Sequence, residues 1–151
     1  MDTKAALNTD VAAIHAAMRE EASGASLHGN PMAVTLGAKI VEARADFVAL
    51  EFEPSHHLLQ GAGVLQGGAV TAMLDFAMAF ATLTGMPTDG TCGTVSLNVS
   101  FLRPAEAGHY RAEGRVDRRS KTMAFTNARL WVEGSEALVA TATSVLAVRA
   151  R

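Results

Sequence analysis

The chain has 151 residues, of which 49% are hydrophobic and 19% are charged, and its formal net charge is −2. This composition predicts one globular domain with a hydrophobic core and excludes a disordered chain. The near-neutral charge, with no long run of either sign, argues against a general nucleic-acid-binding protein. A single cysteine, Cys92, excludes an internal disulfide and fits a reducing compartment, so we expect a cytoplasmic protein.

The N-terminal segment, residues 1–30, predicts a short helix. It carries acidic residues and has no continuous apolar run, so it lacks the pattern of a signal peptide. Thr9 and Asp10 are typical helix-starting residues, the run VAAIHAAMREEAS follows, and Gly24 is a stop signal. We expect this helix to cover a sheet edge or a pocket mouth on a single domain formed by residues 31–151.

Residues 33–43 and 46–53 are expected to form two strands joined by a tight turn near Ala45. Apolar residues alternate with other residues from Met32 to Ile40, and a second apolar run ends at Pro54. The following residues, up to Gln66, predict a loop.

The most informative stretch spans residues 61–86 and reads GAGVLQGGAVTAMLDFAMAFATLTGM. It predicts a helix over about 67–84, because it is too long for a strand, lacks proline and is rich in Ala, Met and Leu. The helix is apolar nearly all round, so we expect it to be buried. It approaches the length of a membrane span, but Asp75 and three threonines favour a buried helix of a soluble protein.

Two features of this helix point to chemistry. The glycine pair Gly67-Gly68 at its start exposes backbone N–H groups, where the helix dipole favours developing negative charge. Asp75 is a carboxylate in apolar surroundings, which is costly unless the group is partnered or used. One helix therefore offers both an oxyanion site and a carboxylate. The alternative is structural: the glycines serve close packing, and Asp75 is partly solvated.

Beyond Gly90 the chain predicts four strands. A period of two runs through residues 94–101 and 110–117, with a turn at Pro104 and Gly108 between them. Two further strands are expected over residues 121–132 and 137–148.

The order is thus helix, two strands, long helix, four strands. It predicts an α+β fold in which an antiparallel sheet of five to six strands wraps around one long central helix. Because a helix that is apolar all round needs cover on its far side, we expect at least a dimer.

The segment Q-x5-QGGAVTAMLD, from Gln60 to Asp75, resembles the active-site segment of hotdog-fold acyl-CoA thioesterases, most closely the phenylacetate-degradation (PaaI-like) type. The pattern of that family is Asn or Gln, then His-Gly-Gly six residues later, then Asp seven beyond the second Gly. The segment SLNVSFLRPAEAGHYRAEGRV, residues 96–116, is similar to the strand, Arg-Pro turn and strand that follow in the family. The resemblance covers about residues 30–148 and implies a hotdog fold.

The resemblance also implies roles for individual residues. Gly67 matches the glycine whose N–H polarises the thioester carbonyl, and Asp75 matches the carboxylate that acts as nucleophile or general base. Gln60 matches an amide that orients water or the carbonyl, and Thr94 matches a hydroxyl that assists water in some members.

The spacing of Gly67 and Asp75 adds an argument that does not depend on the resemblance. Eight residues separate them, about 12 Å along a helix, whereas donors to an oxyanion lie within roughly 3 Å of it. One helix cannot place both groups on one carbonyl, but two helices running antiparallel across a two-fold axis can. We therefore expect two sites per dimer, at the interface of a homodimer or homotetramer.

A basic cluster of Arg118, Arg119 and Lys121 at a strand turn predicts contact with the phosphates of coenzyme A, with Arg103 as a further candidate. The backbone N–H of Gly68 is a further substrate-binding candidate, as a second donor to the thioester oxygen beside Gly67. The alternative for the cluster is a solvated hairpin tip. The five histidines show no metal-ligand spacing, so we expect neither a metal nor another cofactor, CoA being part of the substrate.

Taken together, these features predict a thioesterase that hydrolyses an acyl- or aryl-CoA to the free acid and CoA. Gln66 stands where the family has its histidine, and a glutamine can hydrogen-bond but cannot take up a proton. This departure motivates an alternative, a non-catalytic acyl-CoA-binding or sensing protein. A hydratase on the same fold needs an Asp and a His about five residues apart, and Phe80 holds that position after Asp75.

Overall fold

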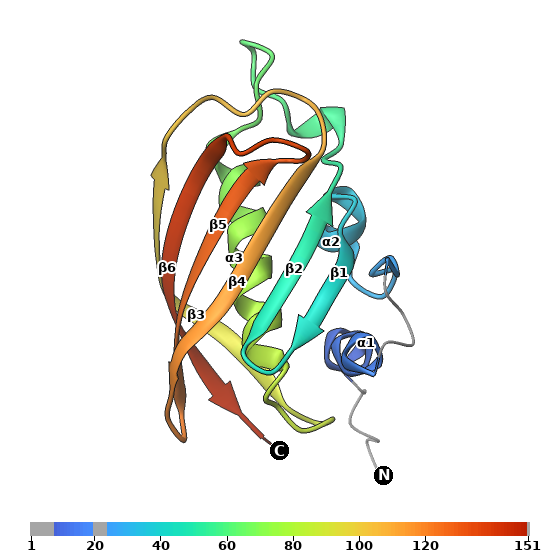
Figure 1. The fold of residues 1–151 in the computed structure, drawn as a ribbon, viewed down its shortest axis with the longest axis vertical. Helices are drawn as coiled ribbons and strands as arrows, with labels where there is room; N and C mark the ends of the chain where they lie inside the picture. The colour runs from blue at the N-terminus through green and yellow to red at the C-terminus, as the bar shows by residue number, and fades with distance from the viewer. Residues whose placement is uncertain (1–7, 20–23, 151) are drawn as a thin grey trace, which may run out of the picture.

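One antiparallel sheet and one long helix make up most of the molecule (Figure 1). The computed structural model describes residues 8–19 and 24–150. The strands are β1 (Lys39–Arg44), β2 (Phe47–Phe52), β3 (Thr91–Phe101), β4 (Tyr110–Arg119), β5 (Met123–Val132) and β6 (Leu138–Arg149). Their order in the sheet is β1-β2-β4-β5-β6-β3, and every neighbouring pair is antiparallel. This confirms the predicted α+β architecture, with six strands.

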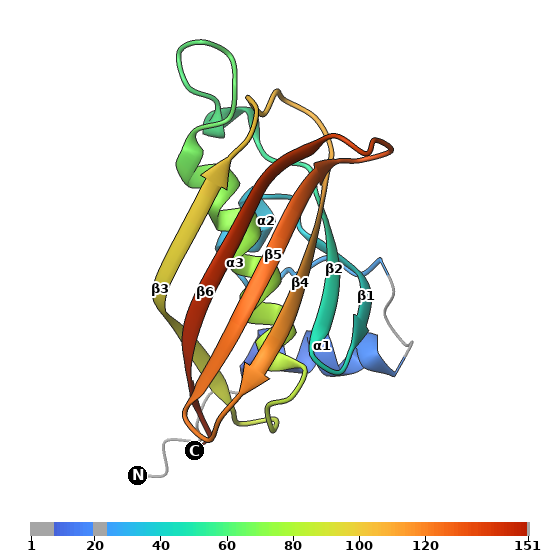
Figure 2. The same ribbon diagram turned by 60° about the vertical axis from the view of Figure 1, so that its left-hand side comes forward.

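Helix α3 (Gly67–Leu83) lies in the curve of the sheet, and Figure 2 shows it behind the strands. The side chains that face the sheet, such as Met73, Leu74 and Ala77, are fully buried. The opposite stripe is only half-buried in a single chain and consists of Thr71, Ala72, Asp75, Phe76 and Ala79. A single chain therefore does not bury α3 on all sides. No helix in the described part of the chain is long and apolar enough to cross a membrane.

Helix α1 (Thr9–Met18) packs against β1 and α3 and buries Val11, Ile14 and Ala17. It begins at Thr9, as predicted, and the side chain of Asn8 caps it by accepting a hydrogen bond from the backbone N–H of Asp10. It ends at Met18, and residues 20–23 of the predicted run lie outside the described residues. The division between an N-terminal segment and a domain at residue 30 stays a prediction.

Residues 31–35 form a short helix, α2 (Pro31–Thr35), where the sequence analysis predicts part of a strand. The side chain of Asn30 caps this helix, and Pro31 occupies a first-turn position, where its missing N–H breaks no hydrogen bond. Met32 and Val34, which carry the apparent alternation, are both exposed, by 45% and 56%. The strand prediction is therefore wrong for this segment, and β1 begins after it.

A short 3₁₀ turn, η1 (His56–Leu58), follows β2. The edge strands of the sheet are β1 and β3. Edge strand β3 pairs with β6, and their register shifts between Thr94 and Ser96, which marks a β-bulge. Val95, in the bulge, is 60% exposed, and Phe101, at the end of the strand, is 55% exposed. The strand that lies beside α3 therefore presents apolar side chains and an open edge.

Candidate active site

Asp75 lies in the middle of α3, on the half-buried stripe that faces away from the sheet. Its Oδ1 accepts a hydrogen bond from the hydroxyl of Thr94, with 2.8 Å between the two oxygens. Thr94 stands directly before the bulge of β3, and a bulge re-aims the side chains next to it. The structure thus brings together two of the site residues that the sequence predicts.

A pocket of about 230 Å³ opens beside Asp75 and Thr94. One wall is apolar and includes the rings of Phe76 and Phe80, which stack with their centroids 5.6 Å apart. The other wall is polar and comes from the starts of α1 and α2, through Asn8, Asp10 and Asn30. The pocket thus has an apolar and a polar side next to Asp75. Because the sequence analysis predicts an acyl substrate at Asp75, we call this space the acyl pocket.

The sequence analysis does not predict several residues that line the acyl pocket. Phe76 and Phe80 are four residues apart on α3, a spacing that places both side chains on one face of a helix and could have predicted an aromatic wall. Asp10 was assigned only as a helix-starting residue. In the structure the side-chain amide of Asn30 donates a hydrogen bond to its Oδ2 over 2.9 Å, and no sequence pattern links these two positions.

Cys92 also lines the acyl pocket, with its Sγ 3.8 Å from the carbonyl oxygen of Ala79. Burial, followed by the nearby charge of Asp75, raises the pKa of the Cys92 thiol to about 12. A thiol with this pKa stays protonated at neutral pH and is a poor nucleophile. The candidate chemistry of the pocket therefore falls to Asp75.

Gly67 and Gly68 form the first turn of α3, where backbone N–H groups have no acceptor within the helix. A Cβ on Gly67 would lie 3.4 Å from Cζ of Phe101, whereas nothing lies within 4 Å of the corresponding position on Gly68. Both glycines leave the start of the helix open to a small group. Gly67 is about 12 Å along the helix from Asp75, so a single chain does not bring the predicted oxyanion donor and the carboxylate together.

Gln60 and Gln66 lie at this glycine end of α3. The Oε1 of Gln60 accepts a hydrogen bond from the backbone N–H of Ala62 over 2.9 Å and so stabilises the loop before the helix. Gln66 is the N-cap residue, its side chain is exposed and it makes no capping hydrogen bond. Neither amide contacts Asp75 within one chain.

The four predicted basic residues fall in different places. Arg103 is exposed in the turn after β3, whereas Arg118 and Lys121 are exposed near the β4–β5 hairpin, at the opposite end of the sheet. Arg119 is engaged: its Nη2 donates to Asp46 Oδ1 over 2.6 Å and to the carbonyl oxygen of Thr82 over 3.1 Å. These contacts tie the β1–β2 turn to the end of α3.

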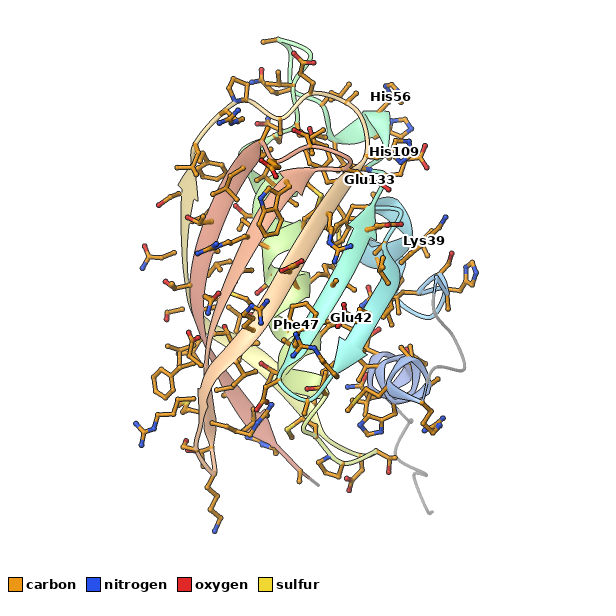
Figure 3. All side chains as sticks on the ribbon, viewed as in Figure 1. Lys39, Glu42, Phe47, His56, His109 and Glu133 are labelled. Atoms are coloured by element: carbon orange, nitrogen blue, oxygen red, sulfur yellow. The ribbon has the colours of Figure 1, made fainter. Side chains whose placement is uncertain are left out.

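None of the five histidines lines the acyl pocket. Figure 3 shows His56, His109 and Glu133 at the same end of the molecule, and His109 stands 3.8 Å from carboxylate oxygens of both Glu53 and Glu133. Within residues 8–19 and 24–150, no group of three or more His, Cys, Asp or Glu side chains is arranged to hold a metal ion.

Comparison with known proteins places this geometry in a family. A putative esterase of Thermoplasma volcanium is 34% identical to the chain over 92 residues, which are 60% of this chain and 66% of that protein. Among solved structures, a phenylacetic acid degradation-related protein from Ralstonia eutropha is 32% identical, with a TM-score of 0.75, over 89% of this chain and 98% of the other. A thioesterase family protein from Silicibacter pomeroyi is 27% identical, with a TM-score of 0.78, over 91% and 99% of the two chains.

The fold is also that of the PaaI protein from the Escherichia coli phenylacetic acid degradation operon, which is 20% identical, with a TM-score of 0.73, over 94% of this chain and 95% of that one. The model of the Thioesterase superfamily matches residues 62–139, which contain α3, β3 with its bulge, β4 and β5. The chain therefore belongs to the Thioesterase superfamily and has the hotdog fold.

Proposed function

We propose that the protein hydrolyses acyl- or aryl-CoA thioesters to the free acid and CoA, with Asp75 as nucleophile or general base. The observation that carries the proposal is the hydrogen bond between Thr94 and Asp75 at a pocket with one apolar wall. Membership of the Thioesterase superfamily supports thioester hydrolysis in general. A carboxylate, a hydroxyl and a space for an acyl group are the parts that this reaction needs.

The oxyanion donor in this proposal comes from a second copy of the chain. The half-buried stripe of α3 leaves Asp75 uncovered, and the apolar side chains of β3 are exposed beside it. If the α3 helices of two subunits pack antiparallel through these stripes, the partner subunit's Gly67 faces Asp75, and its N–H can bind the thioester oxygen. Removing an oxyanion donor of this kind costs on the order of 3 kcal/mol in the activation barrier.

Two reaction routes fit this arrangement. In one, Asp75 attacks the thioester carbonyl, the C–S bond breaks to release CoA thiolate, and water then hydrolyses the anhydride. In the other, Asp75 takes a proton from a water that attacks the carbonyl, the C–S bond then breaks, and the departing CoA thiolate takes up the proton. The Thr94 hydroxyl helps to hold the attacking water. Gln60 and Gln66, which lie near the oxyanion donor, would hydrogen-bond the carbonyl or the water in either route.

For the CoA phosphates we propose Arg118, Lys121 and Arg103, whose side chains are exposed. Arg119 would have to give up its ion pair with Asp46 to reach a phosphate, so it is the weakest candidate of the cluster. We propose a cytoplasmic location, as the single cysteine suggests.

Gln66 supports a second candidate, a non-catalytic acyl-CoA-binding or sensing protein. Its amide is exposed at the start of α3, where it can hydrogen-bond a ligand but cannot transfer a proton. Tight binding of acyl-CoAs without turnover would favour this function.

The replacement Asp75→Asn tests the proposed hydrolysis. It keeps the size of the side chain and a hydrogen-bond acceptor for Thr94, but removes the charge, so we expect kcat/KM to fall about a thousandfold. A panel of acyl- and aryl-CoAs, followed with a thiol-reactive dye that detects released CoA, measures the rates. Glu42→Gln, which removes an equal charge from exposed β1, serves as the control and should keep wild-type rates. Unchanged hydrolysis in Asp75→Asn would remove Asp75 from the mechanism.

A further inference from the structure

Building on the thioesterase function above, we propose that Asp10 is a specificity residue of the acyl pocket. From the first turn of α1 it accepts a hydrogen bond from a hydroxyl at the distal end of the acyl group, and it rejects acyl groups that end in a second carboxylate. The favoured substrates are thus CoA esters of neutral acids with a distal hydroxyl, and the disfavoured ones are CoA esters of dicarboxylic acids.

The position of Asp10 is not explained by helix capping. The side chain of Asn8 already accepts the hydrogen bond from the backbone N–H of Asp10, over 3.1 Å, and so caps α1. The carboxylate of Asp10 instead receives the side-chain amide of Asn30 at Oδ2 and lines the acyl pocket together with Asp75. A carboxylate has two oxygens and can accept several hydrogen bonds, so a substrate hydroxyl can be added to the bond from Asn30.

The neighbours of Asp10 are also held in place. The Oδ1 of Asn30 accepts a hydrogen bond from the backbone N–H of Ala33 at the start of α2, which fixes the direction of the amide that points to Asp10. The buried side chains of α1 anchor the helix that carries Asp10 on the sheet and α3. The polar wall is therefore a defined surface rather than a chance contact.

The charge of the acyl pocket favours the same selection. Of the described residues that line it, two are acidic, Asp10 and Asp75, and none is basic. Burial raises the pKa of the Cys92 thiol most, and both carboxylates raise it further. Both negative charges are therefore felt inside the pocket. Arg119 acts on that thiol in the opposite direction, but its guanidinium is paired with Asp46. The negative charges of Asp10 and Asp75 would thus repel an anionic acyl group, and no basic residue among the described lining residues would offset this repulsion.

The experiment compares three CoA esters of equal chain length: valeryl-CoA, 5-hydroxyvaleryl-CoA and glutaryl-CoA. For the wild type we expect the highest kcat/KM with the hydroxylated ester and roughly a hundredfold lower value with glutaryl-CoA, because a like charge is unfavourable in a partly buried site. Asp10→Asn should raise the glutaryl/valeryl ratio at least about tenfold, since it removes that charge with little change in shape. Asp89→Asn, an equal loss of charge from an exposed loop outside the pocket wall, should leave the ratio unchanged.

Asn30→Ala provides the second variant. This variant weakens the contact between α1 and α2 but keeps the charge of Asp10. If the charge of Asp10 selects the substrate, its glutaryl/valeryl ratio of kcat/KM should stay at the wild-type value. If the ratio depends only on how firmly the wall is held, it should change as much as in Asp10→Asn. Thermal melting checks that each variant is folded.

Calorimetry with the non-hydrolysable thioether analogues of valeryl-CoA and glutaryl-CoA measures the same selection without catalysis. If the wild type hydrolyses none of the esters, the thioesterase proposal fails, and the ratio of the two thioether affinities still decides the role of Asp10. If the wild type hydrolyses them with the same preferences as Asp10→Asn, the specificity proposal is overturned and the thioesterase function stands.

Discussion

The chemistry of each side chain in the acyl pocket depends on its immediate neighbours. Asp75 is half-buried and receives a hydrogen bond from Thr94, which keeps the carboxylate oriented beside the pocket. Cys92 lines the same pocket, but burial and the nearby Asp75 raise its pKa to about 12. The pocket therefore holds one group suited to act as a base or nucleophile and one sulfur that is kept neutral.

The reactivity of Cys92 follows from this pKa. The folded protein keeps the thiol protonated between pH 9 and about 12, whereas the unfolded chain releases its proton near pH 9. This group therefore favours unfolding increasingly as pH rises above 9. At pH 8 we expect alkylation by iodoacetamide to be at least about a hundredfold slower in the native protein than in guanidinium. Mass spectrometry over time measures both rates, and equal rates would show that the thiol is accessible and ionisable.

At the scale of secondary structure elements, α3 approaches β4 closely at Gly114. A Cβ on Gly114 of β4 would lie 2.0 Å from the carbonyl oxygen of Ala77 on α3. The neighbouring atoms at this contact belong to the backbone of α3, so rotating a side chain cannot relieve the clash. The absence of a side chain at Gly114 thus sets the distance between the helix and the sheet, and with it the place of Asp75 relative to β3.

Gly114→Ala should therefore destabilise the protein by about 3 kcal/mol, because overpacking against backbone atoms forces the helix outward. Gly93→Ala is the matched control, since Gly93 lies in β3 of the same sheet and nothing stands within 4 Å of its Cβ position. It should change stability by no more than about 0.5 kcal/mol. Urea unfolding at one protein concentration compares the two, and similar midpoints for both variants would contradict the close contact.

The elements also show where sequence patterns succeed. The prediction of α3 is confirmed because a long run that lacks proline and is rich in Ala, Met and Leu has a high propensity to form a helix. The strand prediction fails at Pro31–Thr35 because the capping by Asn30 and the fixed φ of Pro31 decide the local structure, and alternation over a few residues does not override them.

At the scale of the whole molecule, one chain leaves the stripe of α3 around Asp75 half-buried and the edge of β3 unpaired. Gly67 and Asp75 of the same helix are too far apart to act on one carbonyl. The site that we propose therefore requires two copies of the chain, each supplying one of the two groups to its partner.

Mixing two inactive variants tests this shared site. Gly67→Pro removes the N–H donor, and proline suits the first position of a helix that follows the extended Gln66. Neither Gly67→Pro nor Asp75→Asn should be active alone. After unfolding and refolding together in equal amounts, half of the dimers are mixed and contain one intact site, so we expect about a quarter of wild-type activity. Each variant refolded alone is the control, and no recovery in the mixture would place the site within one chain.

The sequence by itself determined the long helix and the order of the strands, because periodicity and glycine positions are local properties of the chain. The motif around Asp75, also local, predicted the pair of helix residues that a thioesterase site would use. Tertiary structure decided the rest. The β3 bulge that brings Thr94 to Asp75, the wall formed by Asp10 and Asn30, and the engagement of Arg119 by Asp46 all join residues far apart in the chain. Such contacts depend on how helices pack on a curved sheet, which no local pattern records.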